Sequence, residues 1–269
     1  MILKALFERI PAVLCQGSWD TDIASIAMCS KAVTNNSLFI CIRGMEQDGH
    51  QYIQEAAKRG AAACLVEEDF WQQMISVDED REPPDQMISA HRDWKIPEKI
   101  TIVSVKNTRE AAAWAAAAFY RYPSKELKVI GITGTKGKTS TTFMIRDILE
   151  AAGYKTGLLG TIDYEIGHEK KAADRTTPEA IDIQRYLREM ADKGCQFAVM
   201  EVSSQGLKLH RADAVDFDMG VFTNLGRDHI SPKEHKDMEE YAYYKSMLFQ
   251  KCRLGIGNID DPYYREIFK

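Results

Sequence analysis

From residue 127 onward, short apolar runs alternate with amphipathic stretches. The apolar runs predict strands and the amphipathic stretches predict helices. The predicted strands cover residues 127–132, 155–161, 196–202, 217–222 and 253–257, and the predicted helices cover residues 138–152, 179–192 and 237–249. This alternation predicts a mostly parallel sheet covered by helices, in which ligands bind at the carboxyl ends of the strands.

The chain before this region predicts a smaller α/β unit. Strands are expected at residues 37–42, 61–66 and 100–105, and a helix is expected at residues 51–59. Thr108 is expected to cap an alanine-rich helix that ends before Pro123. The charged segment 78–99 contains three prolines and shows no periodicity, so it is predicted to be a surface loop.

A linker at residues 121–126 divides the predicted architecture into two domains, residues 1–122 and residues 127–269. A chain of 269 residues is long enough for two hydrophobic cores. The predicted fold class is α/β: a small N-terminal α/β domain, then a P-loop-type domain with a mostly parallel sheet covered by helices.

Composition limits the possible functions. The chain is 45% hydrophobic and 28% charged, as in ordinary globular proteins. Its net charge of −5 and its lack of a basic block give no support for nucleic-acid binding. The six cysteines form no CxxC pair, which favours reduced thiols. The N-terminus does not resemble a signal peptide, and the longest apolar run is too short to cross a bilayer, so we expect a cytoplasmic protein without a membrane partner.

The glycine-rich stretch at residues 131–140 carries the strongest chemical signal. It follows a predicted strand and precedes a predicted helix, the arrangement in which backbone N–H groups and a helix N-terminus hold phosphates. Lys138 adds a full positive charge, and the Thr139 hydroxyl suits an accompanying Mg²⁺. Ile132 stands where the general P-loop pattern requires a glycine, so this is a shorter variant of that loop. The residues predicted to hold the phosphates of a nucleoside triphosphate are Gly134, Thr135, Lys136, Gly137, Lys138, Thr139 and Ser140.

Two further strand ends carry candidate ligands. Glu201 ends an apolar strand, a position suited to holding Mg²⁺ or orienting water. His229 follows the next strand and an Asn-x-x-Arg-Asp turn, although Mg²⁺ normally prefers oxygen. His50, His91, His168 and His235 are expected to be structural or exposed.

Six motifs occur in one order along the chain. They are Gly-Thr-Lys-Gly-Lys-Thr-Ser (134–140), Thr-Thr-Pro (176–178), Glu-Val-Ser-Ser-Gln-Gly-Leu (201–207), His-Arg (210–211), Thr-Asn-Leu-Gly-Arg-Asp-His (223–229) and Glu-Tyr-Ala-Tyr-Tyr-Lys (240–245). In this order they resemble the central domain of the Mur ligases, specifically the type that adds the third residue of the peptidoglycan stem peptide. Residues 36–44 and the Asp-Gly-His at 48–50 also resemble the N-terminal domain of that family.

The resemblance implies a role for each matching residue. Lys138 would contact the ATP phosphates, Thr139 and Glu201 would hold Mg²⁺, and His229 would contribute to a second Mg²⁺ site. Lys245 aligns with a lysine that CO₂ converts to a carbamate, and in that form it would be a metal ligand. Lys138 and Lys245 would be the two catalytic residues. By helical pattern alone, Lys245 would be a solvated surface charge.

The resemblance also implies substrate contacts. Thr176, Thr177, Ser203 and Arg211 align with residues that hold the dipeptide and muramoyl part of the substrate, and Ser30 aligns with a uridine contact. Residues 1–122 would thus bind the UDP substrate and residues 127–269 would bind ATP. Several positions depart from the family pattern: Lys136 replaces a usual Asn, Gln205 a common His, and residues 29–31 and 45–46 also differ near the uracil site.

The implied reaction has two steps. ATP phosphorylates the terminal carboxylate of UDP-N-acetylmuramoyl-L-Ala-D-Glu, and the amine of the incoming amino acid then displaces phosphate. Such chemistry needs positioning and charge neutralisation rather than a Ser-His nucleophile pair, and no Ser/His/Asp or Cys/His constellation is expected. The family also has a C-terminal domain that selects the amino acid. That domain is expected to be absent from this chain, which alone is expected to bind nucleotide weakly and not to complete ligation.

Two alternatives stay open in the sequence. One is a folylpolyglutamate synthase-like ligase, against which the N-terminal unit counts. The other is a truncated, non-catalytic nucleotide-binding module. The sequence does not decide whether L-lysine, meso-diaminopimelate or another amino acid is added, or whether another chain supplies the C-terminal domain.

Overall fold

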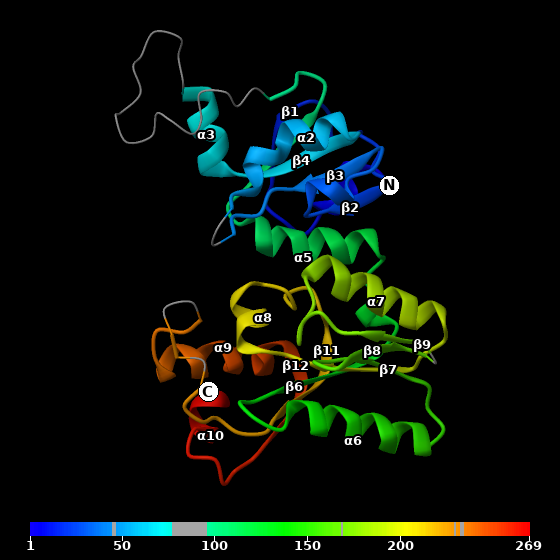
Figure 1. Cartoon of the computed structure of the whole chain (residues 1–269), viewed down its shortest axis with the longest axis vertical. Helices are drawn as coiled ribbons and strands as arrows, with labels where there is room; N and C mark the ends of the chain where they lie inside the picture. Colours follow the sequence, from blue (N-terminus) through cyan, green and yellow to red (C-terminus); the bar gives the residue numbers. More distant parts are fainter. Residues whose placement is uncertain (45–46, 77–95, 168, 229, 232–233) are drawn as a thin grey trace. The chain divides into compact units, whose positions relative to one another are not determined.

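The computed structural model describes residues 1–44, 47–76, 96–167, 169–228, 230–231 and 234–269 (Figure 1). The chain divides into two compact units, residues 1–119 and residues 120–269. Each unit contains its own sheet, and the two are described separately below. The predicted α/β fold class is confirmed. The assignment of a substrate role to one part and an ATP role to the other stays a prediction.

The sheet of the first unit is mostly parallel. In the described residues its strands are β1 (Val13–Gln16), β2 (Ser25–Ala27), β3 (Ser37–Ile40), β4 (Ala61–Glu67) and β5 (Thr101–Val105), in the order β1-β5-β4-β3-β2. Only the β1–β5 pair among them is antiparallel. Every residue of β3 and β5 is buried, so these strands form the centre of the unit's core.

Helices and turns surround this sheet. They are α1 (Leu3–Leu6), η1 (Ser30–Ala32), η2 (Gly49–Tyr52), α2 (Ile53–Lys58), α3 (Glu68–Ser76) and α5 (Thr108–Phe119). The expectation that Thr108 caps the alanine-rich helix is wrong. The Asn107 side chain accepts hydrogen bonds from the backbone N–H groups of Arg109 and Glu110, while Thr108 is buried and donates to Glu67. Most of the predicted loop 78–99 lies outside the described residues.

The sheet of the second unit combines a parallel centre with an antiparallel edge. Its described strands are β6 (Lys128–Thr133), β7 (Thr156–Leu159), β8 (Asp163–Ile166), β9 (Glu169–Ala172), β10 (Phe197–Glu201), β11 (Phe217–Phe222) and β12 (Cys252–Gly257), in the order β12-β11-β6-β10-β7-β8-β9. The pairs from β12 to β7 are parallel, and β7–β8–β9 are antiparallel. Parallel pairing brings the carboxyl ends of β6, β7, β10 and β11 to one edge of the sheet.

Helices cover both faces of this sheet (Figure 1). The described helices are α6 (Lys138–Ala151), α7 (Ala180–Asp192), α8 (Ser204–Lys208), α9 (Met238–Lys251) and α10 (Tyr264–Ile267), with a short turn η3 (Pro123–Lys125) before β6. Ile145 and Leu149 of α6 pack on Ile130 and Val199. The other face packs against α7 and α9 in a core that includes Tyr186 and Leu248. Within the described ranges, no helix has the length and apolarity needed to cross a membrane.

Candidate active site

The glycine-rich loop connects β6 to α6, as the sequence predicts. Gly134 has a φ of +152°, and a Cβ at this position would collide with the Thr223 hydroxyl. Gly137, immediately before the helix, has a φ of +85°, which side-chain-bearing residues rarely adopt. Both glycines therefore allow the backbone conformation of the loop. This conformation brings backbone N–H groups and the N-terminus of α6 together.

Neighbouring segments fix this loop in place. The Thr135 N–H donates to the Asn224 carbonyl at 2.8 Å, and the Gly226 N–H donates to Thr135 Oγ1 at 3.0 Å. The Lys136 N–H donates to the Asn224 side chain at 3.0 Å. Thr135 Oγ1 also lies 3.2 Å from the Tyr241 hydroxyl of α9. The segment after β11 and helix α9 thus hold the loop between them.

The two lysines of the loop differ in their surroundings. Lys138 Nζ turns back into the loop and donates to the carbonyls of Gly134 and Thr135 at 2.9 and 3.2 Å. Burial lowers the pKa of Lys138, while the nearby Glu201 carboxylate opposes this shift. Lys136 instead is exposed and pairs with Asp228 at 2.8 Å. The loop charge aimed inward is therefore that of Lys138.

Glu201 lies at the centre of a second polar cluster. Thr139 Oγ1, in the first turn of α6, donates to Glu201 Oε2 at 3.1 Å. The N–H and the hydroxyl of Thr161 donate to the same carboxylate at 2.8 and 3.1 Å, and the Thr161 hydroxyl also contacts Thr176 at 3.1 Å. Sequence reasoning missed Thr161, although its place at the end of a predicted strand beside the β10 strand was a usable signal. The cluster concentrates hydroxyl and carboxylate oxygens, which are the ligands that Mg²⁺ prefers.

The residues predicted to hold the substrate form a connected group behind Glu201. Thr177 Oγ1 donates to the Glu201 backbone carbonyl at 3.0 Å and lies 3.1 Å from Ser203 Oγ. Arg211 donates to the Thr177 carbonyl at 3.1 Å and pairs with Glu179 at 2.8 Å. Ser203 also caps α8 by accepting from the Gly206 N–H. The structure thus brings Thr177, Ser203 and Arg211 together with Glu201.

Lys245 is buried, contrary to what its helical pattern predicts. Its exposed fraction is 1%, and Nζ donates to the Gly134 carbonyl at 2.9 Å. Burial first, and then the charge of Lys138, lower the pKa of Lys245 well below its ordinary value. The amine therefore lies against the glycine loop, in an environment that favours its neutral form.

His229 lies outside the described residues, so its predicted role remains a prediction. Over the residues that the structure does describe, no three His, Cys, Asp or Glu side chains gather as a metal site would require. A Ser–His pair that the sequence did not predict is present: His235 Nε2 lies 2.9 Å from Ser204 Oγ. The two residues are 1% and 5% exposed, so this pair is part of the core rather than a nucleophile open to a substrate.

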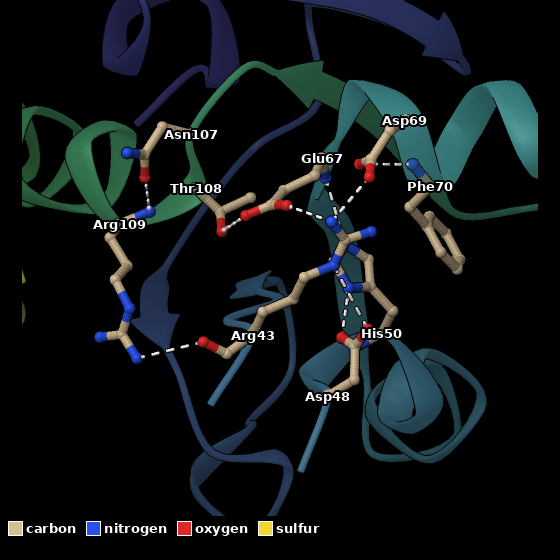
Figure 2. Close-up of polar contacts among 9 residues, drawn as sticks. All are labelled: Arg43, Asp48, His50, Glu67, Asp69, Phe70, Asn107, Thr108 and Arg109. Carbon is tan, nitrogen blue, oxygen red and sulfur yellow. Dashed lines mark hydrogen bonds and ion pairs between the residues drawn. The ribbon is translucent and has the colours of Figure 1, made fainter. Parts of the chain in front are cut away.

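The first unit contains its own polar network (Figure 2). Arg43 forms ion pairs with Asp48, Glu67 and Asp69, the last two at 2.8 and 2.7 Å. Ser30, the predicted uridine contact, is buried and donates to Glu55 at 3.1 Å. The Arg43 network therefore holds the loop after β3 against the end of β4 and the start of α3, and Ser30 is fixed at the start of η1.

His50 is a structural member of this network, as expected. Its ring stacks on Phe70 with 4.2 Å between centroids, Nδ1 contacts Asp48, and Nε2 accepts a hydrogen bond from the Glu67 N–H at 3.1 Å. Since Nε2 must be an acceptor, the ring is neutral with its hydrogen on Nδ1. Burial lowers the pKa of His50, although the Asp48 carboxylate opposes this shift.

Family models match nearly the whole chain. Residues 132–269 match the Mur ligase middle domain, and residues 22–120 match the model described as Mur ligase family, catalytic domain. The chain belongs to the Mur ligase family. Both the glycine loop and the cluster around Glu201 lie within the middle-domain match.

Two curated relatives of this Mur ligase family member carry the same name. The UDP-N-acetylmuramoyl-L-alanyl-D-glutamate–2,6-diaminopimelate ligase of Clostridium perfringens is 38% identical over 269 residues, covering 100% of this chain and 50% of the relative. The ligase of the same name from Bacillus licheniformis is 39% identical and covers 97% of this chain and 49% of its own length. The chain therefore spans about half the length of the curated relatives it matches.

Solved Mur ligases have the same fold. A structure of a UDP-N-acetylmuramoyl-L-alanyl-D-glutamate–2,6-diaminopimelate ligase superposes with a TM-score of 0.72 at 21% identity, covering 99% of this chain and 49% of that one. MurF ligase from Thermotoga maritima in complex with ADP superposes with a TM-score of 0.54 at 19% identity, covering 90% of this chain and 47% of that one. At these identities the likeness concerns the fold.

Proposed function

We propose that this chain forms the nucleotide- and substrate-binding part of an ATP-dependent ligase of peptidoglycan synthesis. The proposed reaction adds an amino acid to UDP-N-acetylmuramoyl-L-Ala-D-Glu through an acyl phosphate. The observation that carries the proposal is the 3.1 Å contact between Thr139 and Glu201. This contact joins the first turn of the phosphate-loop helix to a strand-end carboxylate, and the names of the curated relatives support the substrate class.

The residues of the second unit fit ATP and Mg²⁺. The glycine loop and the N-terminus of α6 suit the phosphates, and Lys138 supplies the positive charge directed into the loop. The oxygens of Thr139, Thr161 and Glu201 suit a magnesium ion. Bound Mg²⁺ neutralises charge that develops on the phosphates during transfer. His229 is proposed for a second magnesium site on the family resemblance alone.

We also propose that Lys245 carries a carbamate. A neutral amine is the form that adds to CO₂, and the burial of Lys245 favours that form. The nitrogen lone pair forms the N–C bond, one C=O electron pair moves to oxygen, and the nitrogen releases a proton. The product carries anionic oxygens, which suit Mg²⁺ better than an ammonium group does.

The substrate contacts are proposals too. Thr177 contacts Glu201, and Thr176, Ser203 and Arg211 are connected to it through Thr161 or Thr177, where a carboxylate to be phosphorylated would meet the nucleotide. Ser30 is proposed as a contact of the uridine in the first unit. The domain roles follow: residues 1–122 bind the UDP substrate and residues 127–269 bind ATP.

Calorimetry on the 269-residue chain tests the proposal directly. We expect binding of ATP that depends on MgCl₂, and thermal stabilisation by UDP-N-acetylmuramoyl-L-Ala-D-Glu but not by a folate. Stabilisation by the folate alone would favour a folylpolyglutamate synthase-like ligase instead. Absence of any Mg²⁺-dependent ATP binding would overturn the proposal. The names of the relatives make 2,6-diaminopimelate the first amino acid to test for turnover.

A further inference from the structure

Tyr241 lies between the glycine loop and Lys245. Its side chain is 1% exposed, and its hydroxyl lies 3.2 Å from Thr135 Oγ1. Lys245 Nζ lies 4.4 Å from the centroid of its ring. Tyr241 and Lys245 are one turn apart on α9, whereas Thr135 belongs to the loop after β6. One side chain therefore contacts two parts of the candidate site that come from distant segments.

The surroundings of Tyr241 restrict its motion. Its partner Thr135 is held by the backbone of Asn224 and Gly226, so the hydroxyl contact has a fixed end. The ring of His235 packs against the Tyr241 ring with 5.0 Å between centroids. Because the hydroxyl is anchored and the ring is packed, the orientation of the aromatic face toward Lys245 is fixed as well.

We infer that Tyr241 is a positioning residue that orients the Lys245 nitrogen for carbamate formation, an inference that rests on the proposed function. The Gly134 carbonyl accepts a hydrogen bond from Lys245 Nζ at 2.9 Å. A carbamate nitrogen keeps one N–H, which can donate to the same carbonyl. The aromatic face carries negative potential, so it disfavours the anionic carbamate oxygens on its own side. Tyr241 and Gly134 together direct those oxygens away from the ring.

Two substitutions on α9 separate this role from general packing. Tyr241→Phe removes only the hydroxyl that contacts Thr135, and Tyr244→Phe makes the same change at a half-buried position on the same helix. Each protein is equilibrated with ¹³C-bicarbonate without nucleotide, and the carbamate signal is measured by ¹³C NMR. Lys245→Arg identifies the signal, because arginine forms no such carbamate. At subsaturating CO₂ we expect Tyr241→Phe to lower carbamate occupancy about fivefold, the effect typical of one lost hydrogen bond. Tyr244→Phe should match the parent chain.

The partner hydroxyl provides an independent check. Thr135→Val should lower occupancy at least as much as Tyr241→Phe does, since it removes the same contact and also the acceptor of the Gly226 N–H. The double variant should lose no more than Thr135→Val alone, because the contact between Tyr241 and Thr135 is already absent there. Thr135→Ser keeps the hydroxyl and should keep the signal, and a thermal melt of each variant verifies folding. Independent, multiplying losses in the double variant would contradict the inference.

The possible outcomes separate the positioning role of Tyr241 from the proposed function on which it rests. Equal occupancy in the parent chain and in a folded Tyr241→Phe variant overturns the positioning role and leaves the carbamate proposal standing. The parent chain must show a carbamate signal that is absent from Lys245→Arg. If it shows none, the carbamate proposal fails and this inference fails with it. Mg²⁺-dependent ATP binding, measured separately, then decides the rest of the proposed function.

Discussion

Thr139 and Glu201 are 62 residues apart in the chain, yet Thr139 Oγ1 lies 3.1 Å from Glu201 Oε2. The contact exists because β10 pairs in parallel with β6, which places Glu201 opposite Ile132 and beside the start of α6. A hydroxyl and a carboxylate that meet at the N-terminus of a helix form a compact set of oxygen ligands next to a phosphate-binding loop.

Glu201→Gln should weaken ATP binding in the presence of MgCl₂. The amide keeps an oxygen that can accept from Thr161 but loses the negative charge that attracts the ion. We expect a loss of roughly 10- to 100-fold, the range found when a metal-site partner is removed. Calorimetry measures it, with Glu126→Gln, an exposed carboxylate paired with Arg188, as the control. Unchanged affinity for Mg–ATP in Glu201→Gln would argue against a metal at this position.

The two lysines of the loop should contribute unequally. Lys138→Ala removes the charge directed into the loop, so ATP binding should fall by at least roughly tenfold, as for a lost charge-assisted hydrogen bond. Lys136→Ala removes an exposed charge that Asp228 already compensates, so the loss should be about threefold and should shrink with added salt. Titrations at two NaCl concentrations compare them. An equal loss in both variants would show that position 136 also contacts the phosphates.

His50 should make the first unit less stable in acid. The pKa of His50 is lowered in the folded state from an ordinary value of 6.5. Below pH 6.5 the unfolded chain therefore binds a proton that the folded chain does not, and the free energy of unfolding falls as the pH drops. The limit is about 1.4 kcal/mol for each pH unit between the unfolded and folded pKa values.

The tryptophans allow this effect to be measured in one unit. All four (19, 71, 94 and 114) fall within residues 1–119, and 19, 71 and 114 belong to the described part of the first unit, so tryptophan fluorescence during urea unfolding reports on that unit. His50→Gln should flatten the decline between pH 7 and pH 5.5, as it removes the titrating group, although the variant loses stability at neutral pH. An equally steep decline in the variant would assign the acid sensitivity to other groups.

The β12 strand should promote self-association. It ends the order of the described strands, and Leu254 and Ile256 on it are 53% and 46% exposed. An exposed apolar edge strand is a site for pairing between chains. Leu254→Lys should shift the chain toward the monomer in analytical ultracentrifugation. Ile75→Lys, at a similarly exposed position on helix α3, should have little effect. A parent chain that stays monomeric at all accessible concentrations would contradict this expectation.

The strands and helices with clear apolar patterns were predictable. The apolar runs after residue 127 correctly predicted β6, β7, β10, β11 and β12, because each is short and bounded by polar or helical segments. The hairpin β8–β9 was missed because every residue of β9 is exposed and charged or small, and its pairing depends on the neighbouring strand rather than on its own composition.

The site was predictable to the extent that glycines and strand ends mark it. Thr139 and Glu201 follow from those signals, and their contact agrees with the expected edge of the sheet. The burial of Lys245 does not follow, because a lysine on a charged helix gives no periodic sign of a core position. The Ser204–His235 pair was equally invisible, since its partners come from separate segments that only folding brings together.

The Gly134 carbonyl is the shared acceptor of two amines, Lys138 and Lys245, each at 2.9 Å. An acceptor oxygen has two lone pairs, and these two lysines occupy both of them. A triphosphate that attracts Lys138 would free one of these lone pairs. Lys245 would then be the remaining lysine that donates to this carbonyl. Nucleotide binding and the hydrogen bonding of the Lys245 amine would then be linked through a single peptide oxygen.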